Sequence, residues 1–283
     1  MKILTLNTHS LLEEHYEEKL QQFVEVIEKE LPAIFALQEV NQTISAKEIT
    51  CPRGYVPCET GGTIVKEDNH AFQLAQKLYE KGIEYTWSWI SVKVGYDKYD
   101  EGLAVFSRYP IAQTVEFCIS KTNEYRNWKT RKVLGIKTGR IPTWYFSVHM
   151  GWWDDIEDPF AQQWDTFCKC IDTLLDQQER CYILGDFNSP SNIPHEGYDY
   201  VIASGWYDTW TLAEKKDCGI TVGKVIDGWR ARMEKETVES GMRIDFIWCN
   251  ETPQIHCSQV ICNGDNYPVV SDHYGVMIEI LEN

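Results

Sequence analysis

Hydrophobic residues alternate or recur at helical spacing along most of the chain, and this pattern predicts strands and helices. Residues 2–6 alternate and are apolar, which is typical of a strand. Residues 16–31 carry apolar side chains every three or four positions and stop before Pro32, so we expect a helix. Two more helices are expected, over 68–82 and from Asp158-Pro159 onward. The other predicted strands are 33–37, 102–107, 132–138, 143–148, 181–184, 243–249 and 274–281.

The order of these elements favours layered sheets. The turn Gly139–Pro142 joins strands 132–138 and 143–148 into an expected antiparallel hairpin. No repeat, low-complexity tract or linker divides the sequence, so we expect a single domain over 1–283. Hairpin-joined strands with helices inserted between them indicate an α+β fold of sheets flanked by helices, rather than a parallel doubly wound sheet.

Composition and charge narrow the classes of function. The chain has 283 residues, of which 43% are hydrophobic and 25% charged, which excludes disorder, coiled coil and collagen. The net charge of −16 repels nucleic acid and anionic lipid, although a local basic groove stays compatible with it. No apolar run approaches the ~20 residues of a membrane span, and no leader pattern is visible at Met1. Ten cysteines without C-x-x-C or zinc spacing predict free thiols and a cytoplasmic location.

Polar side chains follow most of the predicted buried strands. Their positions are the most informative feature of the sequence, because strand ends meet at one rim of a sheet core and rigid rims position functional groups. Asp245 stands out, since it lies inside a strand that otherwise reads Ile-Phe-Ile-Trp, and an unpaired buried carboxylate costs several kcal/mol. Together with Asp245, the residues that flank the predicted strands are Asn7, Glu39, His149, Asp186, Asn188, Asp272 and His273.

The chemistry of this set points to a metal and a phosphoester. Carboxylates and amides are hard oxygen ligands that suit Mg²⁺, with Mn²⁺ as the alternative, and a dedicated zinc site would need Cys and several His. Two histidines can contact a phosphoryl oxygen or transfer a proton, and no serine or cysteine nucleophile motif is present. Taken singly, Asp186 could cap a turn and His149 could be a core histidine. The ordered set favours metal-assisted attack of water on phosphorus.

Seven segments in this order resemble the endonuclease/exonuclease/phosphatase superfamily. Any one of them is weak evidence, but together they span residues 4 to 273. The resemblance implies a four-layer α/β/β/α sandwich of two mostly antiparallel sheets flanked by helices, with the site at one end of the sheets. The segments are LTLNT at 4–8, LQEV at 37–40, EGLAVFSRYP at 101–110, FSVH at 146–149, LGDFN at 184–188, RIDFI at 243–247 and SDH at 271–273.

The resemblance also implies roles for the residues that match these motifs. Glu39 would be the main metal ligand, with Asn7 beside it and Asp272 near the same centre. Asp186 would orient and deprotonate the attacking water. Asn188 would hold that water or a phosphoryl oxygen. One metal ion and two metal ions both remain compatible with this set.

The two histidines receive roles from the same resemblance. His273 would stabilise the charge that develops on phosphorus, oriented by a carboxylate. Asp245 is the better candidate for that carboxylate, and Asp272 stays the alternative. His149 would contact the phosphate or the leaving oxygen, and Glu101 could fix its ring.

Substrate contacts are expected in the variable segments. Arg131 matches a position at which some members place a phosphate-binding arginine, although Arg126 and Lys129 lie close by. Trp152 and Trp153 precede four acidic residues within 154–158, and indole faces with carboxylates suit a sugar ring and its hydroxyls. The alternative is that the two tryptophans cover an edge of the core.

The sequence leaves two questions about the substrate open. The segment Lys224–Arg243 is either a phosphate clamp or a solvated amphipathic helix. Residues 6–10 and 149–153 resemble a subgroup of bacterial phosphatases, the maltose 6'-phosphate phosphatases. The leading hypothesis is a Mg²⁺-dependent phosphomonoesterase that acts on a small phosphorylated metabolite, a sugar phosphate. The alternatives are a nuclease of the exonuclease III or deoxyribonuclease type and a non-enzymatic binding module, and the oligomeric state stays open.

Overall fold

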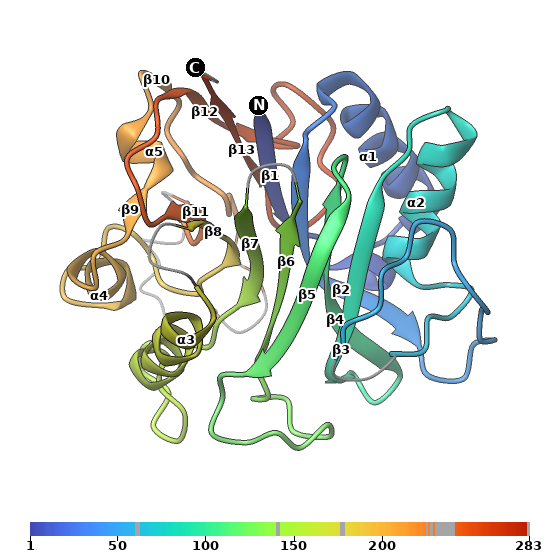
Figure 1. Ribbon diagram of the computed structural model, residues 1–283, viewed down its shortest axis with the longest axis horizontal. Coiled ribbons are helices and arrows are strands. Elements are labelled where there is room, and N and C mark those ends of the chain that lie inside the picture. Colours follow the sequence, from blue (N-terminus) through green and yellow to red (C-terminus); the bar gives the residue numbers. More distant parts are fainter. Residues whose placement is uncertain are drawn as a thin grey trace.

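Two β-sheets face each other, and helices cover the outer face of each (Figure 1). The computed structural model describes residues 1–59, 63–139, 142–175, 179–224, 226, 229 and 241–281. The seven-stranded sheet has, in spatial order, β10 (Lys215–Lys216), β12 (Ile255–Ile261), β13 (Gly275–Ile280), β1 (Lys2–Asn7), β2 (Ile34–Thr43), β4 (Tyr99–Ser107) and β3 (Thr86–Gly95). The six-stranded sheet has β5 (Ile111–Cys118), β6 (Lys132–Thr138), β7 (Thr143–His149), β8 (Arg180–Asp186), β11 (Asp245–Cys249) and β9 (Tyr207–Asp208).

The helices form the two outer layers. Helices α1 (Tyr16–Glu30) and α2 (His70–Glu80) pack on the seven-stranded sheet, and α3 (Phe160–Leu174) and α4 (Gly197–Ala203) pack on the other sheet. The short η1 (Ser10–Leu12) and α5 (Thr209–Leu212) lie in connections. Neighbouring strands are antiparallel except for β1 with β2, β7 with β8 and β10 with β12. The expected four-layer sandwich of mostly antiparallel sheets is therefore confirmed.

The central strands are apolar on both faces because each lies between a helix layer and the opposite sheet. In β1, Ile3 points into the core between the sheets, whereas Leu4 and Leu6 pack under the helices. In β8, Leu184 faces the other sheet and Ile183 faces α3. This alternation between two buried faces produces the continuous apolar runs in the sequence. No helix in the described part of the chain is long and apolar enough to cross a membrane.

Several predicted boundaries are wrong for identifiable reasons. β2 continues past the predicted end at residue 37 to Thr43, because a bulge lets the strand go on pairing with β4. α2 begins at His70 with Asn69 as its cap, whose side chain accepts from the Phe72 N–H, while the Asp68 carboxylate accepts from the backbone of Thr43.

The chain also contains elements that the pattern did not reveal. β5 is an edge strand with polar, half-exposed positions, and β12 reads Ile-His-Cys-Ser-Gln-Val-Ile, so neither shows a clear apolar face. β3 and the short α4 were likewise not predicted. The strands of the predicted hairpin, β6 and β7, do pair antiparallel, whereas residues 140 and 141 of its turn lie outside the described residues.

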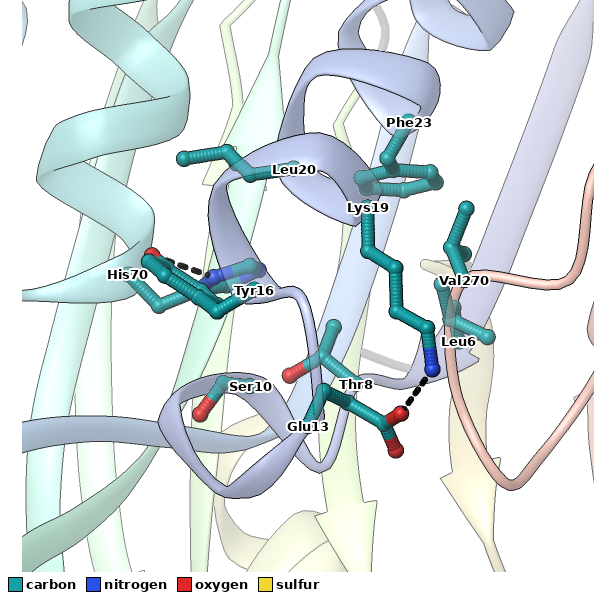
Figure 2. Close-up of a pocket in the computed structure, with 10 residues that line it drawn as sticks. All are labelled: Leu6, Thr8, Ser10, Glu13, Tyr16, Lys19, Leu20, Phe23, His70 and Val270. Carbon is teal, nitrogen blue, oxygen red and sulfur yellow. Dashed lines mark hydrogen bonds and ion pairs between the residues drawn. The ribbon is translucent and has the colours of Figure 1, made fainter.

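The contact between α1 and α2, the two helices that pack on the seven-stranded sheet, includes a buried histidine. Figure 2 shows Tyr16 at the start of α1 facing His70 at the start of α2. The Tyr16 hydroxyl and His70 Nδ1 are 3.1 Å apart and share a hydrogen bond, and His70 Nε2 has no partner in the described structure. Burial lowers the pKa of His70 to about 4, so the folded protein holds this ring neutral.

We expect His70 to make the folded protein less stable as the pH is lowered. The unfolded chain binds a proton at His70 near pH 6.5, whereas the folded chain does so only near pH 4. Its contribution is therefore complete above pH 6.5 and is lost by about 1.4 kcal/mol per pH unit as the pH falls toward 4. Urea unfolding of wild type and His70→Gln at pH 7, 6 and 5 measures this. As the pH is lowered, the free energy of unfolding of the variant should increase relative to that of wild type at this rate. The same substitution at the half-buried His256 is the control, and a pH-independent difference for His70→Gln would contradict the expectation.

Candidate active site

Strand register brings the polar side chains to one rim of the two sheets. In the six-stranded sheet, His149 at the end of β7 is level with Asp186 at the end of β8, and Asp186 is level with Asp245 at the start of β11. In the other sheet, Asn7 ends β1 level with Gln38 of β2. The parallel pairs β1–β2 and β7–β8 thus place residues from distant parts of the sequence in two facing rows.

Asp186 is the centre of this group and is 1% exposed. Its Oδ2 lies 3.2 Å from Asn7 Nδ2, 3.5 Å from His149 Nε2 and 3.8 Å from His273 Nε2. Its Oδ1 accepts the backbone N–H of Asn188 at 2.8 Å. Burial raises the pKa of Asp186 to about 7, although the positive charge of His273 opposes the shift. A carboxylate with this pKa can accept a proton near neutral pH.

The backbone around Asp186 is shaped for close approach. Gly185 has a φ of +151°, and a Cβ there would lie 1.9 Å from the Val148 carbonyl oxygen of β7, so only glycine fits. Asn188 adopts a left-handed conformation. Its Nδ2 donates to the Met150 carbonyl at 3.0 Å and its Oδ1 accepts from Trp229 Nε1 at 3.0 Å. The amide of Asn188 is therefore fixed at both of its polar atoms.

Asp245 is the carboxylate that contacts His273. Its Oδ2 lies 2.9 Å from His273 Nδ1, and both residues are nearly completely buried. Burial opposes a charge on the His273 ring, but Asp245, Asp186 and Asp272 together raise its pKa well above the ordinary value. His273 therefore carries a positive charge, which the carboxylates of Asp245 and Asp186 balance.

His149 stays neutral in the same rim. Burial, together with the charges of Arg131, Lys93 and His273, lowers the pKa of His149 well below its ordinary value. Glu101, which we expected to fix this ring, pairs instead with Lys93, whose Nζ lies 3.1 Å from Glu101 Oε1. No hydrogen bond joins Glu101 to His149 within the described chain, so the expectation for Glu101 is corrected.

Glu39 lies where β2 bulges. Its φ of +51° belongs to the bulge between Leu37 and Val40, which turns the Glu39 carboxylate toward Asn7, whose Nδ2 donates to Glu39 Oε1 at 2.9 Å. Burial and the charges of Glu101 and Asp272 raise the pKa of Glu39. Carboxylate and amide oxygens crowded in this way fit a hard divalent cation, which would offset their repulsion.

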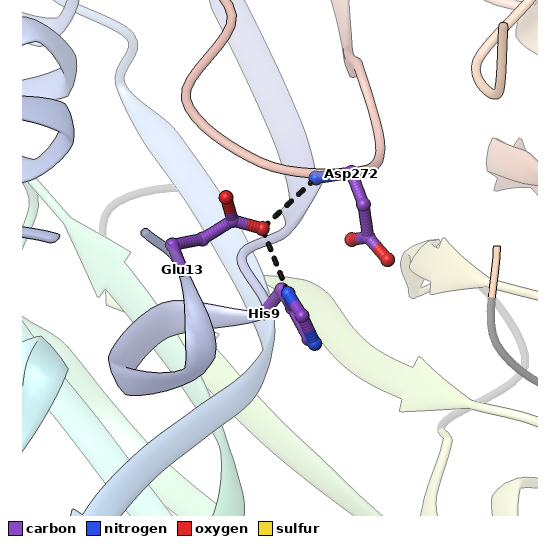
Figure 3. A group of neighbouring side chains, drawn as sticks. All are labelled: His9, Glu13 and Asp272. Carbon is purple, nitrogen blue, oxygen red and sulfur yellow. Dashed lines mark hydrogen bonds and ion pairs between the residues drawn. The ribbon is translucent and has the colours of Figure 1, made fainter. Parts of the chain in front are cut away.

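Asp272 belongs to a second cluster, with His9 and Glu13 (Figure 3). Glu13 Oε1 lies 2.7 Å from His9 Nδ1 and accepts the backbone N–H of Asp272 at 3.2 Å. Lys19 pairs with the other oxygen of Glu13 (Figure 2). Burial opposes a charge on His9, but Glu13, Asp272 and Glu39 raise its pKa to about 9. Sequence reasoning missed His9, although it follows Asn7 by two residues and precedes Glu13 by four.

The rim opens into a pocket of about 400 Å³. Its lining includes carboxylates and His9, and also Lys93, Arg131 and His149. Trp128 and Trp152 also line it, with ring centroids 5.9 Å apart, and Trp128 is 52% exposed. Pocket residues that the sequence had not indicated are Lys93, Val94, Gly95, Tyr96, Trp128 and Ile226.

Not every predicted substrate contact reaches this pocket. Trp153 packs against Phe160 and Tyr200 and does not line it, which agrees with the alternative of an aromatic covering the core. Arg131 does line it and is 3% exposed. One terminal nitrogen of Arg131 donates to the carbonyl of Trp128 at 3.2 Å, which anchors the guanidinium beside the pocket.

The acidic residues after Trp153 stabilise their own loop. Asp155 pairs with Lys129 at 2.8 Å and accepts the backbone N–H groups of Glu157 and Asp158. Asp158 accepts the backbone N–H of Lys121. Asp155 and Asp158 thus each use one carboxylate oxygen to stabilise the loop, and neither residue lines the pocket.

The basic segment Lys224–Arg243 is described only at its ends and at two positions between. Arg230, Arg232 and Lys235 lie outside the described residues. Arg243 pairs with the buried Asp208 at 2.7 Å and lies over the Trp210 ring, so this arginine is part of the core and not of a phosphate clamp.

Fold and rim together define the deoxyribonuclease-I-like class of phosphoesterases. The chain belongs to the endonuclease/exonuclease/phosphatase family, whose model matches residues 4–273. It is similar to an endonuclease/exonuclease/phosphatase family protein from Leptotrichia buccalis, with 29% identity, a TM-score of 0.84 and complete coverage of both chains.

Two more distant solved structures share the fold. A mannosyl-6-phosphatase from Bacteroides thetaiotaomicron has 15% identity and a TM-score of 0.66, with complete coverage of both chains. Truncated TDP2 from Caenorhabditis elegans has 14% identity and a TM-score of 0.58, with 99% of this chain and 97% of that chain covered. None of the curated proteins matches the chain.

We expect Asp245→Asn to lower the pKa of His273, because it removes the carboxylate charge and the strongest acceptor of the ring. NMR titration of the histidine rings measures this directly, and His273 should lose its proton at lower pH in the variant. Asp272→Asn is the graded control and should have a smaller effect, since no hydrogen bond joins Asp272 to the ring in the described structure. An equal effect of the two substitutions would contradict the assignment.

Proposed function

We propose that this protein is a metal-dependent phosphomonoesterase that hydrolyses a sugar phosphate. The observation that carries the proposal is the pocket of about 400 Å³, which is lined both by carboxylates and by two buried cations, Lys93 and Arg131. This volume matches the 300–1,000 Å³ typical of small-molecule sites. A phosphate group bound in this pocket would have its negative oxygens toward the cations, and a water activated at Asp186 would attack its phosphorus.

Each residue of the rim has a role in this proposal. Asp186 orients the attacking water and accepts its proton, as its pKa of about 7 allows. His273, charged and held by Asp245, stabilises the negative charge that develops on the phosphoryl oxygens. Asn188 holds the water or a phosphoryl oxygen. His149, which is neutral, donates a hydrogen bond to the phosphate or the leaving oxygen.

The cation is proposed to be Mg²⁺, with Mn²⁺ as the alternative, because the proposed ligands Glu39, Asn7 and Asp272 all offer hard oxygens. Glu39 would be its main ligand, with Asn7 beside it and Asp272 near the same centre. A divalent cation supplies charge neutralisation for the phosphoryl oxygens and lowers the pKa of water. Arg131, which lines the same pocket, is proposed to contact the phosphate.

The sugar is proposed to lie against Trp128 and Trp152 at the pocket, where indole faces can stack on a pyranose ring. Trp152 keeps its expected role, and Trp128 joins it in place of Trp153. The resemblance at residues 6–10 and 149–153 supports maltose 6'-phosphate as the first substrate to test. The Bacteroides mannosyl-6-phosphatase is 15% identical and is evidence for the fold alone.

A nuclease of the exonuclease III or deoxyribonuclease type is the alternative, since it would use the same rim. The net charge of −16 disfavours a long polyanion, which needs positive charge along an extended groove. We further propose one domain over 1–283 and a cytoplasmic location. The ten cysteines are all free, as a reducing compartment would keep them.

A hydrolysis panel tests the proposal. We expect phosphate release from maltose 6'-phosphate or another sugar phosphate with Mg²⁺ or Mn²⁺, loss of activity with EDTA, and no nicking of plasmid DNA at low salt. Asp186→Asn and His273→Ala should each lower turnover by about 10²- to 10⁴-fold, because proton transfer and charge stabilisation contribute this much. His195→Ala, an exposed histidine of the loop after β8, is the matched control and should keep full activity. Chelator-insensitive turnover, or DNA nicking without phosphatase activity, would overturn the proposal.

A further inference from the structure

Lys93 is a buried lysine in the wall of the pocket, and none of the roles above uses it. It lies in β3, is 7% exposed, and pairs with Glu101 on the adjacent strand β4. A buried ammonium costs several kcal/mol of desolvation, and a single carboxylate offsets this cost only in part. A lysine in this position therefore gains from an additional anionic partner.

The hydrogen-bonding capacity of the wall is not filled. An ammonium has three N–H donors, and Glu101 is the one acceptor that lies near Lys93 Nζ in the described chain. Arg131 Nε is buried and has no hydrogen-bond partner there either. Lys93 and Arg131 line the same pocket beside His149. They lie so close together that the charge of Arg131 helps to lower the pKa of Lys93. Donors without acceptors thus gather at one place.

Glu101 explains how two cations can share this wall without a ligand. Its carboxylate reduces the repulsion between the two cations, because it pairs directly with Lys93 and its charge also favours the charged form of Arg131. The three groups together carry one net positive charge in a protein whose net charge is −16. The wall therefore attracts anions locally although the molecule as a whole repels them.

We propose that Lys93 and Arg131 form a two-cation site that binds the terminal oxygens of a phosphate dianion and so selects phosphomonoesters over phosphodiesters. This inference rests on the proposed function and adds the charge state of the substrate to it. A monoester phosphate presents up to two negative charges near neutral pH, whereas a diester presents one and has an ester group in place of a charged oxygen. Both ligands offer at least two terminal oxygens, but the attraction to the two cations scales with ligand charge, so the dianion gains about twice as much from this wall as the monoanion.

Binding of inorganic phosphate and dimethyl phosphate tests this site without turnover. The variant Lys93→Met with Glu101→Gln removes the ammonium without leaving an unpaired buried charge, and it keeps the net charge of the wall, so a loss of affinity reports the direct contacts of Lys93. By calorimetry with Mg²⁺ at pH 8, inorganic phosphate should bind this double variant about tenfold or more weakly, since hydrogen bonds to charged groups contribute this much. Dimethyl phosphate should change by less than about threefold. Lys93→Arg, which keeps the charge, should restore most of the phosphate affinity.

A matched control removes a similar ion pair elsewhere. Lys137 in β6 pairs with Glu179 at the opposite end of the sheet, so Lys137→Met with Glu179→Gln should leave both affinities unchanged. Equal weakening of both ligands in the Lys93 double variant, or no weakening of either, would overturn the inference. Wild type that binds phosphate in this manner but hydrolyses no monoester would overturn the proposed function alone.

Discussion

The structure of the site depends on one buried carboxylate, Asp186, and on the groups that make its burial tolerable. Asn7 and the backbone of Asn188 donate hydrogen bonds to it, and the charged His273 lies within 4 Å. These partners come from three segments of the chain, so the fold must be complete before all of them can compensate the charge. The cost of burying Asp186 unpaired therefore couples the correct pairing of both sheets to the assembly of the rim.

Two parallel strand pairs provide the geometry that this compensation needs. β1 and the pair β7–β8 end at the same rim, β2 passes it at its bulge, and the antiparallel β11 and β13 begin there. Gly185 allows β8 to approach β7 so closely that His149 and Asp186 become neighbours. The bulge at Glu39 performs a similar function in the other sheet, because it turns one carboxylate to the rim without ending the strand. Small departures from regular strand geometry thus position the chemistry.

The sequence predicted the layers and the rim because both depend on local patterns. Buried strands such as 181–184 are continuous apolar runs, and each is followed by a polar residue that the register later aligns. Lys93 and Trp128 could not be found in this way. Lys93 lies inside β3, a strand that was not predicted, and its burial becomes visible only when Glu101 of β4 is placed beside it. Trp128 lies in a loop whose course is set by long-range contacts such as Lys129 with Asp155.

The acidic residues after Trp153 have a structural role. The acids after Trp153 suggested a surface for hydroxyl groups, yet Asp155 and Asp158 hold a loop together through Lys129 and three backbone N–H groups. That loop carries Trp152 to the pocket, next to Trp128. The Lys129 ammonium also lies over the ring of Trp128. The acidic loop therefore contributes to recognition indirectly, by fixing an aromatic surface. The charge that a ligand in this pocket meets is set by the buried groups that line it, among them the cations Lys93 and Arg131, and not by the abundant surface acids.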